Sequence, residues 1–101
     1  MKRRMIDGGG WLDLDTAEHF GEETFWNGQN HASVNTRSEW AHETLYRTKR
    51  GTYILHGTSR WQGAQDTWTR LDTAEAVAWL ILNDHEPDLP AELAIVAALE
   101  V

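Results

Sequence analysis

Two histidines in the central part of the chain are the side chains best suited to proton transfer or metal binding. His42 and His56 lie within strand-like sequence, and the hairpin register derived below places them on one sheet face as near-diagonal neighbours. A zinc site needs more ligands than two, and Glu43, next along the chain, points to the opposite face. Because no third ligand or substrate pocket is evident from the spacing, we predict no metal, no cofactor, no catalytic residue and no enzyme activity.

Short catalytic motifs are missing from the sequence. It contains no GxSxG, P-loop, HExxH or GxGxxG motif, and residues 8–10 (GGG) lack the strand–turn–helix context of a phosphate loop. The chain has no cysteine, which excludes disulfides, thiolate metal sites and a cysteine nucleophile. With no apolar leader and no long apolar run, we expect a cytoplasmic protein that makes no membrane contact.

A second group of side chains mixes cations with aromatic rings, in residues 60–61 (RW), in residues 68–70 (WTR) and at the hairpin tip. Such a surface can stack bases and contact phosphates. Alternatively, Trp61 and Trp68 pack into the core and the arginine stems cover them. The net charge of −7 opposes nucleic acid in bulk, so direct nucleic-acid binding is the alternative hypothesis. The residues that would carry it are Arg47, Lys49, Arg50, Arg60 and Trp61.

Acidic residues are concentrated toward both ends of the sequence. Residues 5–35 and 71–101 contain acids and no lysine or arginine, whereas residues 36–70 are mildly basic. An acidic surface attracts a basic partner and steers its association, although most charged residues serve only to solvate a surface. The candidate partner-binding acids are Asp84, Glu86, Asp88 and Glu92.

The segment from residue 40 to residue 61 is predicted to be one antiparallel hairpin. Its two arms are rich in β-branched and aromatic residues, and residues 49–51 (KRG) form a three-residue loop whose glycine can take positive φ. Pairing Thr48 with Thr52 places Leu45 and Leu55 on one face, which we expect to be core. The opposite face is either a second packing layer or a binding platform. Its candidate contact residues are Trp40, His42, Tyr46 and His56.

The remaining elements follow from turn and capping residues. We expect a flexible arm over residues 1–10, strands at 11–15, 17–26 and 66–71, and a hairpin turn at Asn27-Gly28. Asp72 and Glu75 form a capping box that begins a helix ending at Asn83, and Pro90 begins a second helix. Strands followed by helices predict one α+β domain over residues 11–101: an antiparallel sheet of four or five strands with two C-terminal helices on one face.

Three short segments resemble bacterial proteins carried on plasmids, phages and other mobile elements. They are residues 26–33 (WNGQNHAS), 40–48 (WAHETLYRT) and 59–63 (SRWQG), and the similarity extends over about residues 20–83. That group supplies no activity or catalytic residue to carry over. Small, acidic, cysteine-free proteins of mobile elements include anti-CRISPR and other anti-defence inhibitors, which commonly occupy the nucleic-acid-binding surface of a large host complex.

The function expected by this analogy is therefore inhibition of a host nucleic-acid-processing complex through an acidic surface. The expected partner is a host protein or ribonucleoprotein complex. Exposed strand edges at residues 11–15 or 66–71 can pair between copies, so the sequence allows a monomer or a homodimer.

Overall fold

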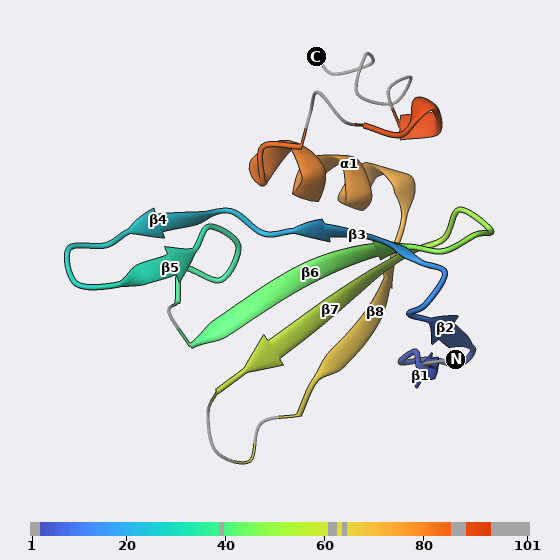
Figure 1. Cartoon of the computed structure of the whole chain (residues 1–101), viewed down its shortest axis with the longest axis horizontal. Coiled ribbons are helices and arrows are strands. Elements are labelled where there is room, and N and C mark those ends of the chain that lie inside the picture. Colours follow the sequence, from blue (N-terminus) through green and yellow to red (C-terminus); the bar gives the residue numbers. More distant parts are fainter. Residues whose placement is uncertain (1–2, 39, 61–62, 64, 86–88, 94–101) are drawn as a thin grey trace.

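The computed structural model describes residues 3–38, 40–60, 63, 65–85 and 89–93. Over these residues a four-stranded antiparallel sheet lies beside two small hairpins (Figure 1). The main sheet has the order β3-β6-β7-β8, with β3 at Glu18–Gly21, β6 at Ala41–Arg47, β7 at Tyr53–Ser59 and β8 at Thr67–Leu71. The hairpins are β1 (Arg3–Met5) with β2 (Trp11–Asp13), and β4 (Thr24–Trp26) with β5 (His31–Ser33).

The central hairpin formed by β6 and β7 has the predicted register. Its pairs run from Ala41 opposite Ser59 to Arg47 opposite Tyr53, and they include the predicted pair of His42 with Thr58. The Thr48 amide donates to the Thr52 carbonyl at 2.9 Å, and Gly51 in the loop has φ of 81°. A three-residue loop with positive φ at its glycine holds the strands in this register, so the prediction from loop chemistry is confirmed.

The two faces of the main sheet are covered by different elements. On one face the helix α1 (Thr73–Leu82) packs on Leu45 and Tyr53, in a cluster that also contains Phe20 and Leu80. The opposite face is partly covered by the β1–β2 hairpin through the buried residues Ile6, Leu12, Ile54 and Trp68. That face is therefore a packing layer near β8, and it is open near the two ends of the central hairpin.

Helix α1 begins and ends as predicted. The Asp72 carboxylate accepts from the Glu75 amide at 2.8 Å, and the Glu75 side chain accepts in return from the Asp72 amide at 3.1 Å. Asn83 caps the carboxyl end. Of the predicted second helix, residues 91–93 are helical and Leu93 is buried against the α1 core, while its remaining residues lie outside the described part of the chain.

The broad fold prediction, an antiparallel sheet with a helix packed on one face, is confirmed. The described residues form eight strands rather than four or five. The strand expected over residues 17–26 is divided into β3 and β4 because Glu22 turns its carboxylate inward, where it accepts from the Glu43 amide and the Ser33 hydroxyl. The segment expected to be a flexible arm contains β1, whose return to β2 passes through three glycines with positive φ.

Candidate functional site

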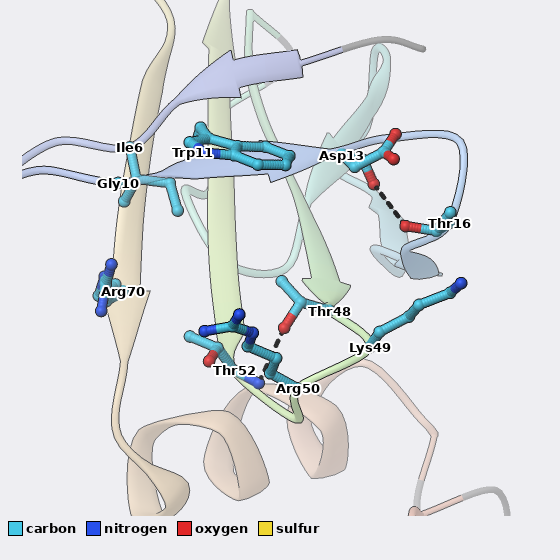
Figure 2. Close-up of a pocket in the computed structure, with 10 residues that line it drawn as sticks. All are labelled: Ile6, Gly10, Trp11, Asp13, Thr16, Thr48, Lys49, Arg50, Thr52 and Arg70. Atoms are coloured by element: carbon cyan, nitrogen blue, oxygen red, sulfur yellow. Dashed lines mark hydrogen bonds between the residues drawn. The ribbon is translucent and has the colours of Figure 1, made fainter.

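A pocket of about 500 Å³ lies between the β1–β2 hairpin and the loop that joins β6 to β7. We call it the tip pocket. Figure 2 shows the Trp11 ring facing that loop across the pocket, with the Arg70 side chain at one side. The residues that give the pocket its chemistry are Trp11, Thr48, Lys49, Arg50, Thr52 and Arg70.

Each cation of the tip pocket is positioned by local structure. Lys49 and Arg50 occupy the exposed positions of the three-residue loop. Arg70 lies opposite Ile54 in the sheet, and its guanidinium donates to the Gly9 carbonyl at 3.2 Å. A Cβ on Gly10 would lie 2.6 Å from the Arg70 Nη2 atom, so a side chain at this position would displace the guanidinium.

The tip pocket combines positive charge with an exposed aromatic ring. Three of its lining residues are cations, whereas Asp13 is its single acidic lining residue among those described, and Asp13 already accepts from the Asp15 amide at 2.9 Å. The Trp11 side chain is 51% exposed, and the guanidinium of Arg3 lies 4.2 Å from its ring centre. The arrangement can attract an anionic ligand and stack a planar one.

Arg47 and Glu92, predicted to belong to two different binding surfaces, are paired with each other. The Arg47 Nε atom donates to the Glu92 carboxylate at 2.8 Å, and the Tyr53 hydroxyl donates to it at 3.0 Å. The hydrogen bond between Arg47 and Glu92 raises the pKa of Arg47. The pKa of the Glu92 carboxyl is lowered, first by a hydrogen bond from its own backbone amide and then by those from Arg47 and Tyr53. Both charges therefore stabilise the contact between the sheet and residues 89–93.

The four residues predicted to form a sheet-face site do not share one open surface. His42 is paired with the Glu22 carboxylate. His56 stacks on Trp68 at 3.7 Å between ring centres, and its Nε2 atom lies 3.0 Å from the Asp66 carboxylate. Tyr46 packs against the buried cluster beneath β1–β2, and Trp40 is 43% exposed. The four residues thus have different environments.

The remaining predicted residues are dispersed. Asp84 is exposed just beyond α1, where it takes a positive φ of 64°. Arg60 lines a second pocket at the far end of the central hairpin, together with Trp40 and His42. Glu86, Asp88 and Trp61 lie outside the described residues. The structure therefore brings Lys49 and Arg50 together at one site, but not with Arg47 or Arg60.

Trp11 was not among the predicted site residues, and Arg70 belonged to the basic and aromatic group but not to the contact residues chosen from it. Strand alternation in residues 66–71 places Arg70 on the same face as Ile54, so the sequence contained that signal. No comparable signal identified Trp11, because its position depends on the pairing of β1 with β2 and on the docking of that hairpin against the main sheet.

Neither a metal site nor a membrane-spanning helix is found among the described residues, and comparison with known proteins identifies no family. Within the described ranges no group of three histidine, aspartate or glutamate side chains is arranged to hold a metal ion. In the same ranges, no helix is long and apolar enough to cross a membrane. No protein-family model, curated protein or solved structure matches the chain.

Proposed function

We propose that the protein is a non-catalytic binding protein that holds single-stranded nucleic acid in its tip pocket. The observation that carries this proposal is the placement of Trp11 opposite Lys49, Arg50 and Arg70 around one concavity. Cations neutralise backbone phosphates, and an exposed ring stacks an unpaired base, which a duplex does not offer.

The negative net charge of the whole chain is compatible with a local anionic site. Exposed charges separated by more than about 10 Å are largely screened at 0.1 M salt. The potential in the tip pocket is therefore set mainly by its own three cations and by Arg3 above the Trp11 ring, against the single carboxylate of Asp13 among the described lining residues. Acids near α1, such as Glu75 and Asp84, act mainly on the other side of the main sheet, where α1 packs.

Fluorescence anisotropy with labelled oligodeoxythymidine tests the proposal. We expect the logarithm of the binding constant to fall with the logarithm of salt concentration with a slope of about −2, since each phosphate contact on a single strand contributes about −0.7. The double variant Lys49→Gln/Arg50→Gln should reduce the slope to about −0.7. Trp11→Ala should weaken binding by about tenfold with little change in slope, because stacking of a base is worth about 1–3 kcal/mol.

The matched control is Arg37→Gln. It removes a cation that lies over Phe25 on the β4–β5 hairpin, away from the tip pocket, and should leave both affinity and slope unchanged. If Arg37→Gln lowers the affinity as much as the pocket variants do, the binding depends only on net charge, and the proposal is contradicted. A duplex of the same length that binds as tightly as the single strand would also contradict it.

Inhibition of a host nucleic-acid-processing complex through an acidic surface is our second candidate. The observation that favours it is the net charge of −7, together with the exposed carboxylate of Asp84. The predicted acidic surface loses one free carboxylate, because Glu92 is paired with Arg47 and Tyr53. A pull-down from a bacterial lysate tests this candidate. It would be favoured over the first if the protein binds no oligonucleotide but recovers a defined complex that survives nuclease treatment and is lost in the variant Asp84→Lys.

A further inference from the structure

A second pocket, of about 360 Å³, lies between the β4–β5 hairpin and the ends of β6 and β7. We call it the distal pocket. Its lining residues are Thr24, Asn30, His31, Trp40, His42 and Arg60. They come from three separate segments of the chain, so the pocket exists only when the β4–β5 hairpin is in place beside the main sheet.

The distal pocket repeats the chemistry of the tip pocket. It has one partly exposed tryptophan, Trp40, and one arginine, Arg60, with hydroxyl and amide groups from Thr24 and Asn30. None of the described residues that line it is acidic. An aromatic face beside a guanidinium is suited to a nucleotide, because the ring stacks the base and the cation contacts the phosphate.

Hydrogen bonds hold the distal pocket in a preformed arrangement. The Arg60 amide donates to the Trp40 carbonyl at 2.9 Å, which fixes the two residues side by side. His42 is paired with Glu22, and the same carboxylate accepts from the Ser33 hydroxyl at 2.8 Å and from the Glu43 amide at 2.7 Å. The backbone that carries Trp40 and Arg60, and the imidazole of His42, are therefore ordered before a ligand binds.

The two pockets lie at opposite ends of one face of the central hairpin, and the β1–β2 hairpin covers part of the surface between them. His42 lies in β6 and Thr48 directly follows this strand, and the even number of positions between them places both side chains on the same face. Six residues at about 3.3 Å each separate them by roughly 20 Å. About six nucleotides of a stacked strand cover that distance at about 3.4 Å each. The hydroxyls of Thr44 and Thr58 lie on the same face, toward the distal pocket.

We propose that the distal pocket is a second nucleotide site for the same single strand that occupies the tip pocket, with Trp40 as the stacking ring and Arg60 as the phosphate contact. This inference rests on the proposed function. It predicts that the binding affinity depends on strand length, because only a strand that spans the central hairpin can occupy both pockets. Joining two weak sites through one ligand raises the overall affinity without any new contact.

A length series of oligodeoxythymidines, from about two to twelve nucleotides, tests the inference by anisotropy competition. We expect affinity to rise steeply once the strand exceeds about six nucleotides and then to level off. Trp40→Ala and Arg60→Gln should each weaken binding of a long strand by about tenfold and remove the step in the series. Short strands held by the tip pocket should bind both variants as they bind the wild type.

The variants separate failure of this inference from failure of the proposed function. If the wild type binds long strands, Trp11→Ala weakens that binding, and neither Trp40→Ala nor Arg60→Gln does so, the tip pocket stands and the second site is overturned. If no oligonucleotide binds the wild type, both proposals fall. Trp40→Ala must keep the wild-type circular dichroism spectrum, and Arg60→Gln provides the same test without loss of a large side chain.

Discussion

The phenol of Tyr53 shows how one residue joins the core of the protein to its polar surface. Its ring is 2% exposed and packs in the cluster beneath α1, while its hydroxyl donates to the Glu92 carboxylate. Burial, reinforced by the bond to Glu92, raises the pKa of Tyr53 to about 12. Both effects favour the neutral phenol, because ionisation would place a second negative charge beside a carboxylate.

A pH titration provides the prediction at this scale. Since folding raises the pKa of Tyr53, its contribution to the free energy of unfolding is complete below about pH 10 and is lost as the pH rises toward 12. The chain has two tyrosines, so the variant Tyr46→Phe isolates the absorbance change of Tyr53 at alkaline pH. We expect a midpoint close to 12 while the circular dichroism stays native. A midpoint near 10 in the folded state would contradict the assigned environment.

Among the elements, the outer edge of β8 is protected by the loop between β1 and β2. The Asp7 amide donates to the Trp68 carbonyl at 2.8 Å, and the Asp7 carboxylate accepts from the Trp68 amide at 3.1 Å. Asp7 thus occupies both outward backbone groups of Trp68 and places a charge at the edge. Unpaired strand edges promote association between copies, and a charged side chain at the edge opposes it.

Replacing Asp7 with alanine should therefore promote self-association. The Asp7→Ala variant leaves the Trp68 amide without its carboxylate acceptor, and we expect a concentration-dependent increase in mass by light scattering and a loss of about 1–2 kcal/mol in the free energy of unfolding. Asp7→Asn keeps a side-chain acceptor and should retain most of the stability. Glu23→Ala, at an exposed acid elsewhere, is the control. A monomeric Asp7→Ala protein of wild-type stability would contradict this role.

Local signals in the sequence were enough to predict the elements that neighbours in the chain determine. The register of the central hairpin follows from its three-residue loop and from alternation, and the start of α1 follows from the box formed by Asp72 and Glu75. The pairing of β1 with β2 was missed because three consecutive glycines are typical of a flexible segment as well as of a turn. The break between β3 and β4 was missed because it depends on distant acceptors and donors around Glu22.

At the scale of the whole molecule, a buried amide connects the helix to the peripheral hairpin. Asn83 is 1% exposed, and its side chain accepts from the Glu23 amide at 2.8 Å and donates to the Trp79 carbonyl at 2.7 Å. Its amide also donates to the Asn35 side chain at 2.8 Å. These bonds attach the β4–β5 hairpin, and with it one wall of the distal pocket, to the carboxyl end of α1.

Loss of this amide should destabilise the whole domain. We expect Asn83→Ala to lower the free energy of unfolding by about 2 kcal/mol, because the part-buried amide of Glu23 loses its acceptor and Asn35 loses its partner. Urea unfolding followed by tryptophan fluorescence measures the change. Gln29→Ala, at an exposed amide on the β4–β5 turn, should change stability by less than about 0.5 kcal/mol. Equal stability of Asn83→Ala and the wild type would show that the network carries no net energy.

The candidate site could be predicted only in part, for the same reason. Lys49 and Arg50 were identified because both belong to one loop, and chain neighbours stay together in any fold that keeps the loop. Trp11 reaches that loop only through the docking of a separate hairpin, which the sequence pattern did not predict. The pairing of Arg47 with Glu92 likewise joins positions 45 residues apart, so composition alone placed them on two different surfaces.

The contact between Asp7 and Trp68 also sets an order of assembly. It joins residues 61 positions apart, as does the bond from Arg70 to Gly9, whereas the β6–β7 and β7–β8 pairs join strands adjacent in the chain. Closing a long loop costs more entropy than closing a short one. During synthesis, the β1–β2 hairpin leaves the ribosome before β8 and has no edge to dock against until β8 follows. We therefore expect this hairpin to reach its native place after the main sheet has formed, and its docking completes the tip pocket.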